Sequence, residues 1–69
     1  MKISARNVIP GTITEIKKGA TTSHVLLDIG GGTILTASIT NESVEGLKLS
    51  VGQKAFAVIK SPDVMIGVE

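Results

Sequence analysis

Residues 21–39 read TTSHVLLDIGGGTILTASI, two alternating runs on either side of three consecutive glycines. Apolar residues occupy every second position of each run, which is the period of a β-strand with one buried face. The apolar residues that share a face are Val25, Leu27 and Ile29 in the first run, and Leu35, Ala37 and Ile39 in the second. No helical pattern begins after the glycines, so they are predicted to form a hairpin turn and not a phosphate-binding loop.

Turn signals on both sides of this hairpin divide the rest of the chain into further short strands. Residues 2–9 and 12–17 are expected to merge into one strand that bends at Pro10-Gly11, and in its first part Ser4 and Arg6 would share a face. The remaining strand-like runs are residues 54–60 and 64–68.

Residues 40–46, TNESVEG, are the exception to the strand pattern. Hydroxyl and amide side chains at the start suit a helix N-cap, and Gly46 suits the residue just past a helix end, so one or two helical turns are predicted. The whole chain, residues 1–69, is therefore expected to be one all-β domain with one short helix, in the element order of a five-stranded OB-like barrel.

The composition agrees with strands and points to self-association. Ile, Val and Thr supply 23 of 69 residues, and these β-branched side chains favour strands. The chain has no cysteine and one histidine, so neither disulfides nor a thiolate or imidazole metal site is available to stabilise it. Because a core this small leaves only a few kcal/mol of stability, we expect an oligomer.

Neither a leader nor a membrane segment is indicated. Residues 1–6 contain no apolar run, and the longest one in the chain, residues 55–59, is far shorter than the ~20 residues that cross a bilayer. A cytoplasmic location is therefore expected.

Catalysis is not expected, because the acidic residues are scattered and His24, on an exposed strand face, has no partners for a triad or a metal. An OB-type module that binds single-stranded nucleic acid remains the alternative. Such binding uses stacking aromatics and a basic groove, whereas this chain has one aromatic residue, Phe56, and a net charge of +1. A purely structural oligomerisation domain is the third possibility.

Hydroxyl groups occur beside cations at the predicted strand and helix ends. Arginine, lysine and hydroxyl side chains are the donors that a small oxyanion requires, and such a site needs no metal ion. These candidate residues are Ser4 and Arg6, Thr40 and Ser43, and Lys60 and Ser61.

At these residues the chain resembles the molbindins, small molybdate-binding proteins. The resemblance rests on ISARN at residues 3–7, KG at 18–19, IT-x-x-SV at 39–44 and VIKS-x-DVM at 58–65. It implies a homohexamer, a trimer of dimers, with the ligand held at subunit interfaces. We therefore expect storage or homeostasis of molybdate, with tungstate as an equivalent ligand, and we expect no nucleic-acid or membrane partner and no other cofactor.

The resemblance also implies a role for each candidate residue. Ser4, Arg6, Lys60 and Ser61 would form one wall of the principal site, and Thr40 and Ser43 of a neighbouring subunit would close it. A second class of site, lined by backbone N–H groups, would lie near Gly19, Ala20 and Thr22. Pro10 departs from the family pattern, and because proline lacks an N–H, strand pairing is expected to differ locally.

Overall fold

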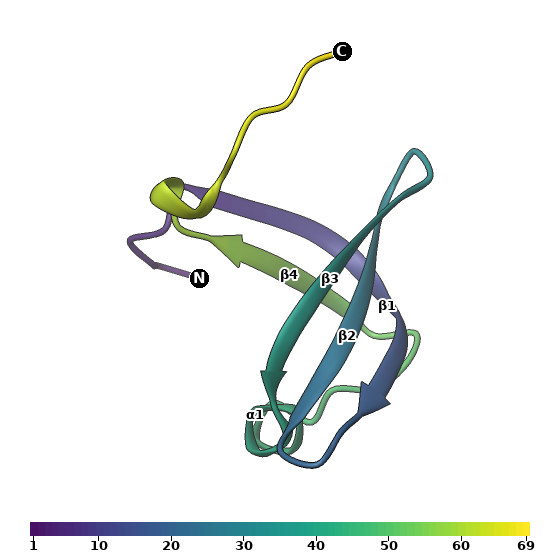
Figure 1. The fold of residues 1–69 in the computed structure, drawn as a ribbon. Helices are drawn as coiled ribbons and strands as arrows, with labels where there is room; N and C mark the ends of the chain where they lie inside the picture. The colour runs from purple at the N-terminus through teal and green to yellow at the C-terminus, as the bar shows by residue number, and fades with distance from the viewer.

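A computed structural model describes all residues, 1–69, as one curled antiparallel sheet with strand order β3-β2-β1-β4 (Figure 1). The sheet strands are β1 (Asn7–Lys18), β2 (Thr22–Gly30), β3 (Thr33–Thr40) and β4 (Lys54–Ile59). Helix α1 (Asn41–Gly46) joins β3 to β4, and the short 3₁₀ helix η1 (Ser61–Asp63) follows β4. The all-β class with one short helix is confirmed. None of the helices has the length and apolar character needed to span a membrane.

The glycine-rich hairpin is confirmed. Gly30 pairs with Thr33, and the two residues between them, Gly31 and Gly32, have φ values of 63° and 83°. Positive φ at both central residues defines the type I′ turn, whose twist matches that of the flanking strands.

Strand β1 is the single bent strand predicted from the sequence, and it changes partners along its length. Residues 7–12 pair with β4, and residues 12–18 pair with β2. Pro10 pairs with Phe56 without a register shift. This part of β1 has a neighbouring strand on one side only, and proline is tolerated in sheets at such edge positions. The expectation that Pro10 alters the pairing is therefore not met.

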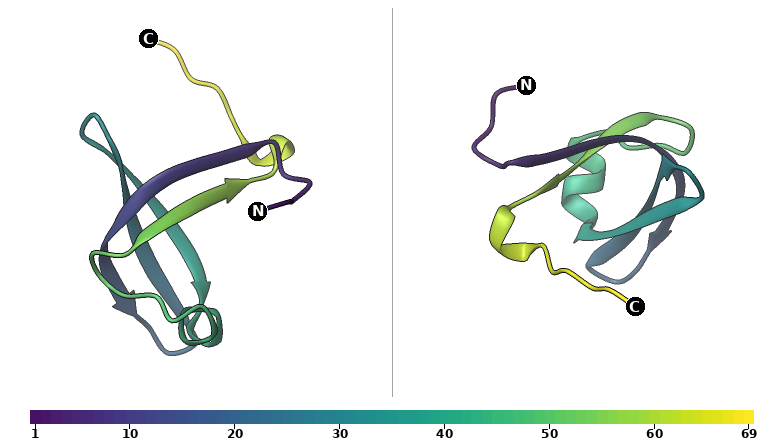
Figure 2. Two further views of the ribbon diagram at one scale, coloured as in Figure 1. Left: turned by 180° about the vertical axis from the view of Figure 1, so that it is seen from behind. Right: turned by 90° about the horizontal axis from the view of Figure 1, so that it is seen from above.

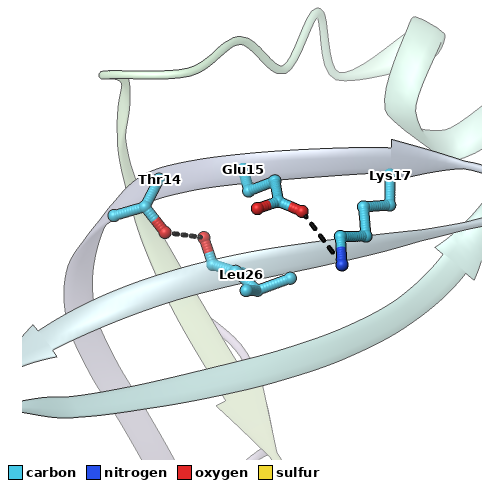
Figure 3. A network of polar contacts seen from close by, with 4 residues as sticks. All are labelled: Thr14, Glu15, Lys17 and Leu26. Atoms are coloured by element: carbon cyan, nitrogen blue, oxygen red, sulfur yellow. Dashed lines mark hydrogen bonds and ion pairs between the residues drawn. The ribbon is translucent and has the colours of Figure 1, made fainter.

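A β-bulge lies further along β1, where Ile13 pairs with Leu27 but Glu15 pairs with the preceding residue, Leu26. Thr14 is the extra residue, and its hydroxyl donates to the Leu26 carbonyl at 3.4 Å (Figure 3). Beyond the bulge, Glu15 and Lys17 form an exposed ion pair at 3.3 Å. Because the bulge shifts the alternation by one residue, both Ile13 and Ile16 reach the core.

Helix α1 begins as predicted but ends differently. Thr40 is its N-cap, whereas Gly46 lies inside the helix and Lys48, with φ of 53°, is the left-handed residue that ends it. The N–H of Lys48 donates to the Glu45 carbonyl, and that of Leu49 to the Val44 carbonyl, which is the Schellman pattern. Leu49, the residue after this reversal, packs against the core.

The structure has four strands where five were predicted. Strand β1 starts at Asn7, so Ser4 and Arg6 precede the strand and are not part of it. Residues 64–68 form no strand, and from residue 65 onward the backbone makes no hydrogen bond within the chain. This C-terminal segment runs away from the sheet (Figures 1 and 2), and the outer edges of β3 and β4 have no strand partner.

The core is small and open on one side. Only Ile13, Val25, Leu27 and Ser23 are buried. The inner face of the curled sheet instead lines an open, mostly apolar groove of about 760 Å³ that reaches from β3 and the residues after α1 to β4. We call this the apolar groove.

Candidate functional site

Four of the candidate residues gather where β1 begins and β4 ends. Asn7 and Ile59 are the last pair of these strands, and the Asn7 side chain donates to the Ile59 carbonyl at 3.2 Å. Arg6 and Lys60 are the next residues outward from that pair. We call this group, Ser4, Arg6, Lys60 and Ser61, the cationic end.

The cations at this end are free to bind an anion. All four residues are exposed, and the one ion pair of the chain is the distant Lys17–Glu15 pair. Lys60 and Ser61 lie at the turn into η1, where Lys60 is the N-cap residue but gives no side-chain capping bond. A guanidinium, an ammonium and two hydroxyls without internal partners are therefore available as hydrogen-bond donors.

Thr40 and Ser43 form a second polar group at the start of α1. The Ser43 N–H donates to the Thr40 hydroxyl oxygen at 3.0 Å, and the Thr40 hydroxyl donates to the Ser43 hydroxyl oxygen at 2.8 Å. This chain of bonds leaves the Ser43 hydroxyl hydrogen without an acceptor in the protein. It polarises that hydroxyl as a donor to an external oxygen atom.

Gly19 and Ala20 belong to the turn between β1 and β2, and Thr22 is the first residue of β2, beside the second group. The Gly19 N–H is already bonded to the Thr22 carbonyl at 2.8 Å, so it is not available to a ligand. Thr22 pairs with Thr40 across β2 and β3. The candidate second site therefore adjoins Thr40 and Ser43.

One chain does not bring together the six residues of the predicted principal site. The cationic end lies at the start of the 12-residue strand β1, whereas Thr40 and Ser43 lie near its end, beside the β1–β2 turn. Figure 1 shows η1 and α1 at opposite ends of the sheet. A site that uses both groups needs a second chain.

Two polar residues that sequence reasoning did not select hold this second end together. Asn41 bonds to the β1–β2 turn, and Ser23, 2% exposed, donates to the Asn41 side chain at 2.5 Å. One signal of this contact is present in the sequence: Ser23 is a polar residue on the same inward strand face as Val25 and Leu27. His24 is exposed, as predicted, and no cluster of His, Cys, Asp or Glu side chains could hold a metal ion.

These features define a class of protein: a small, curled, OB-like β-domain with exposed hydrogen-bond donors at its two ends. Comparison with known proteins agrees. Residues 3–66 match the model of the TOBE domain. A probable molybdenum-pterin-binding protein of Haemophilus influenzae is 45% identical over 69 residues, which is the full length of both chains.

Two solved structures have the same fold. A molybdate-binding protein from Sporomusa ovata superposes with a TM-score of 0.92 at 38% identity, over 99% of this chain and 100% of that one. The cytoplasmic molybdate-binding protein ModG, with molybdate bound, superposes with a TM-score of 0.93 at 42% identity, over 100% of this chain and 49% of that one. The chain belongs to the TOBE domain family and is of the molbindin type.

Proposed function

We propose that this protein binds molybdate, and equally tungstate, at interfaces between its own copies. The observation that carries the proposal is the cationic end, where Arg6 and Lys60 lie beside two hydroxyls with no carboxylate in ion-pair distance. A doubly charged tetrahedral oxyanion would exchange bound water for these donors. The relatives' ligand supports molybdate as the anion.

A second copy would complete the site. Arg6, Lys60, Ser4 and Ser61 would contact the anion from one side, and the Ser43 hydroxyl of the neighbouring copy, polarised by Thr40, would contact it from the other. Arginine presents a planar fork of donors, and charge-assisted hydrogen bonds to an anion are about twice as strong as neutral ones. The same contacts suit tungstate, which has the same charge and shape.

The apolar groove supports assembly. Its lining includes residues of β3 and β4, whose outer edges have no strand partner. The unpaired C-terminal segment carries Met65, Ile66 and Val68, each at least 87% exposed. We propose that the groove is covered by a second copy, whose residues 64–68 supply the missing fifth strand, and that such dimers form a hexamer.

The role that follows is reversible storage of the oxyanion in the cytoplasm, without catalysis. Binding through hydrogen bonds and charge, with no covalent step, lets the anion dissociate as its free concentration falls. The cytoplasmic location rests on the relative ModG, which is described as cytoplasmic.

Calorimetric titration with molybdate, tungstate, sulfate and phosphate tests the proposal, with native mass measured on the same sample. We expect the two larger oxyanions to bind an oligomer and the smaller two to bind more weakly. A single-stranded oligonucleotide is the fifth ligand titrated. Binding of the oligonucleotide with no response to any oxyanion would contradict the proposal and favour the nucleic-acid alternative.

A further inference from the structure

Every polar group of the Asn41 side chain is engaged by one neighbouring segment, residues 19–23. Its Nδ2 group donates to the carbonyls of Gly19, at 3.0 Å, and Ala20, at 3.3 Å. Its Oδ1 atom accepts from the hydroxyl of Ser23. The backbone N–H of Asn41 adds a fourth bond, to the Thr21 carbonyl at 2.9 Å.

Helix α1 depends on such bonds for its position. It has six residues, none of them buried, and helices of this length are unstable by themselves in water. Ser23, in contrast, is almost fully buried in β2, between the paired strands β1 and β3. The bond from Ser23 to Asn41 therefore joins the first turn of α1 to the rigid part of the sheet.

The hydroxyls that face a ligand lie on either side of this attachment. Thr40 precedes Asn41 and also pairs with Thr22, and Ser43 receives the Thr40 hydroxyl bond two residues later. A rotation of the first helical turn would move the Ser43 hydroxyl away from the site. Supporting hydrogen bonds hold the groups that contact a ligand in position to within a fraction of an ångström.

We propose that Asn41, anchored by Ser23, is a positioning residue for the oxyanion site: it sets the place of the Thr40–Ser43 hydroxyl pair without touching the anion. This inference rests on the proposed function. It also means that the β1–β2 turn and the Thr40–Ser43 pair are linked, because Asn41 lies between Thr40 and Ser43 in the chain and its side chain bonds to the turn.

Asparagine is the residue type that this attachment requires. Aspartate is the same size and keeps the acceptor for Ser23, but it loses both donors and places a charge against the Gly19 and Ala20 carbonyls. Alanine loses all three side-chain bonds. Asn41→Asp and Asn41→Ala therefore test the donors and the whole attachment separately.

The test is calorimetric titration of the assembled variants with molybdate. Asn41→Ala, Asn41→Asp and Ser23→Ala are each expected to lower the affinity on the order of tenfold, as loss of a supporting hydrogen bond does at other ligand sites. Ser38→Ala is the matched control, because Ser38 is an exposed strand serine with no side-chain hydrogen bond, and it should bind as the parent does. Parent-like affinity in both Asn41 variants would overturn the inference.

A double-mutant cycle separates positioning from general destabilisation. If Asn41 acts through Ser43, adding Asn41→Ala to Ser43→Ala should cost little further affinity. If the two losses simply add, Asn41 does not act through that hydroxyl and the proposal is wrong.

Amide hydrogen exchange on the ligand-free oligomer tests the attachment independently of molybdate. The Ser43 amide should exchange faster in Asn41→Ala, while the Val25 amide in the core is unchanged. If the parent protein fails to bind molybdate, the proposed function fails, yet this measurement still decides whether Asn41 holds the helix. Unchanged exchange at Ser43 would show that it does not.

Discussion

Arg6 and Lys60 are the side chains on which anion binding depends most. Both are exposed at the cationic end and neither is part of an ion pair. A hydrogen bond to a charged group contributes about 1.5–3 kcal/mol, which corresponds to a loss of roughly ten- to a hundredfold in affinity when it is removed. We therefore expect Arg6→Ala and Lys60→Ala each to weaken molybdate binding by that factor, measured by titration calorimetry.

Lys17→Ala is the control for the loss of one positive charge, since Lys17 is exposed and already paired with Glu15. It should bind molybdate almost as the parent does. The assignment of the cationic end fails if Arg6→Ala and Lys60→Ala both keep full affinity while remaining folded oligomers.

Lys48 carries a backbone conformation that favours glycine. Its φ of 53° places Cβ close to the following carbonyl, and glycine at this end position of a helix removes that penalty. Lys48→Gly should raise the free energy of unfolding by about 0.5–1 kcal/mol, after the greater unfolded-state entropy of glycine is subtracted. Urea denaturation at one fixed protein concentration measures the change, and Lys48→Ala, which keeps Cβ, should show no such gain.

At the scale of single residues, the sequence reveals the donor groups but not the residues that hold them in place. Hydroxyls beside cations are visible in the chain, so Ser4, Arg6, Thr40, Ser43, Lys60 and Ser61 remain a prediction that the fold accommodates. The bonds of Asn41 reach residues 18 to 22 positions away. Such contacts depend on how the β1–β2 turn packs against α1, which local patterns do not encode.

Among the elements, β1 is the one that shapes the sheet, and Gly11 permits its bend. A Cβ atom at Gly11 would lie 2.7 Å from both the Leu27 side chain and the Asp28 carbonyl, closer than atoms can pack. Gly11→Ala should therefore lower the free energy of unfolding by about 1–3 kcal/mol, the usual cost of overpacking.

Gly46→Ala is the matched substitution for this prediction. No atom lies within 4 Å of a Cβ placed there, and Gly46 is inside α1, where alanine is favoured by up to about 1 kcal/mol. Urea denaturation should give a free energy of unfolding below that of the parent for Gly11→Ala and above it for Gly46→Ala. A Gly11→Ala protein as stable as the parent would contradict the close approach of β1 to β2.

The hairpin, the bent strand and the helix start follow from local patterns, because a type I′ turn, a Pro-Gly bend and a hydroxyl N-cap each depend on few residues. The bulge at Thr14 does not follow from a local pattern. The sequence only hints at it, because Ile13 and Ile16 are three residues apart, which strict strand alternation would place on opposite faces. The expected fifth strand at residues 64–68 has the right alternation, but a strand also needs an edge to pair with. Within one chain this segment pairs with neither free edge of the sheet.

For the whole molecule, the apolar groove and the unpaired C-terminal segment point to one assembly. Ile66 is 87% exposed in the single chain, and in the proposed dimer it enters the groove of the partner. Ile66→Asp should abolish or strongly weaken oligomer formation, because a buried carboxylate without a partner is very costly. Native mass across a dilution series measures this.

Val51→Asp is the matched control, since Val51 is 64% exposed but lies in the turn before β4, away from the groove lining. It should form the same oligomer as the parent. If Ile66→Asp also keeps the parent mass at every dilution, the C-terminal segment is not the contact that closes the groove.

The central claim, that each site takes the cationic end of one chain and the Ser43 hydroxyl of another, is tested most directly by mixing subunits. Arg6→Ala and Ser43→Ala proteins are unfolded together, refolded as a mixture and titrated with molybdate. Random mixing should restore about a quarter of the sites to full affinity, because those sites draw both intact groups from different chains. If the mixture binds no better than the average of the two variants alone, both groups act within one chain and the interface site is wrong.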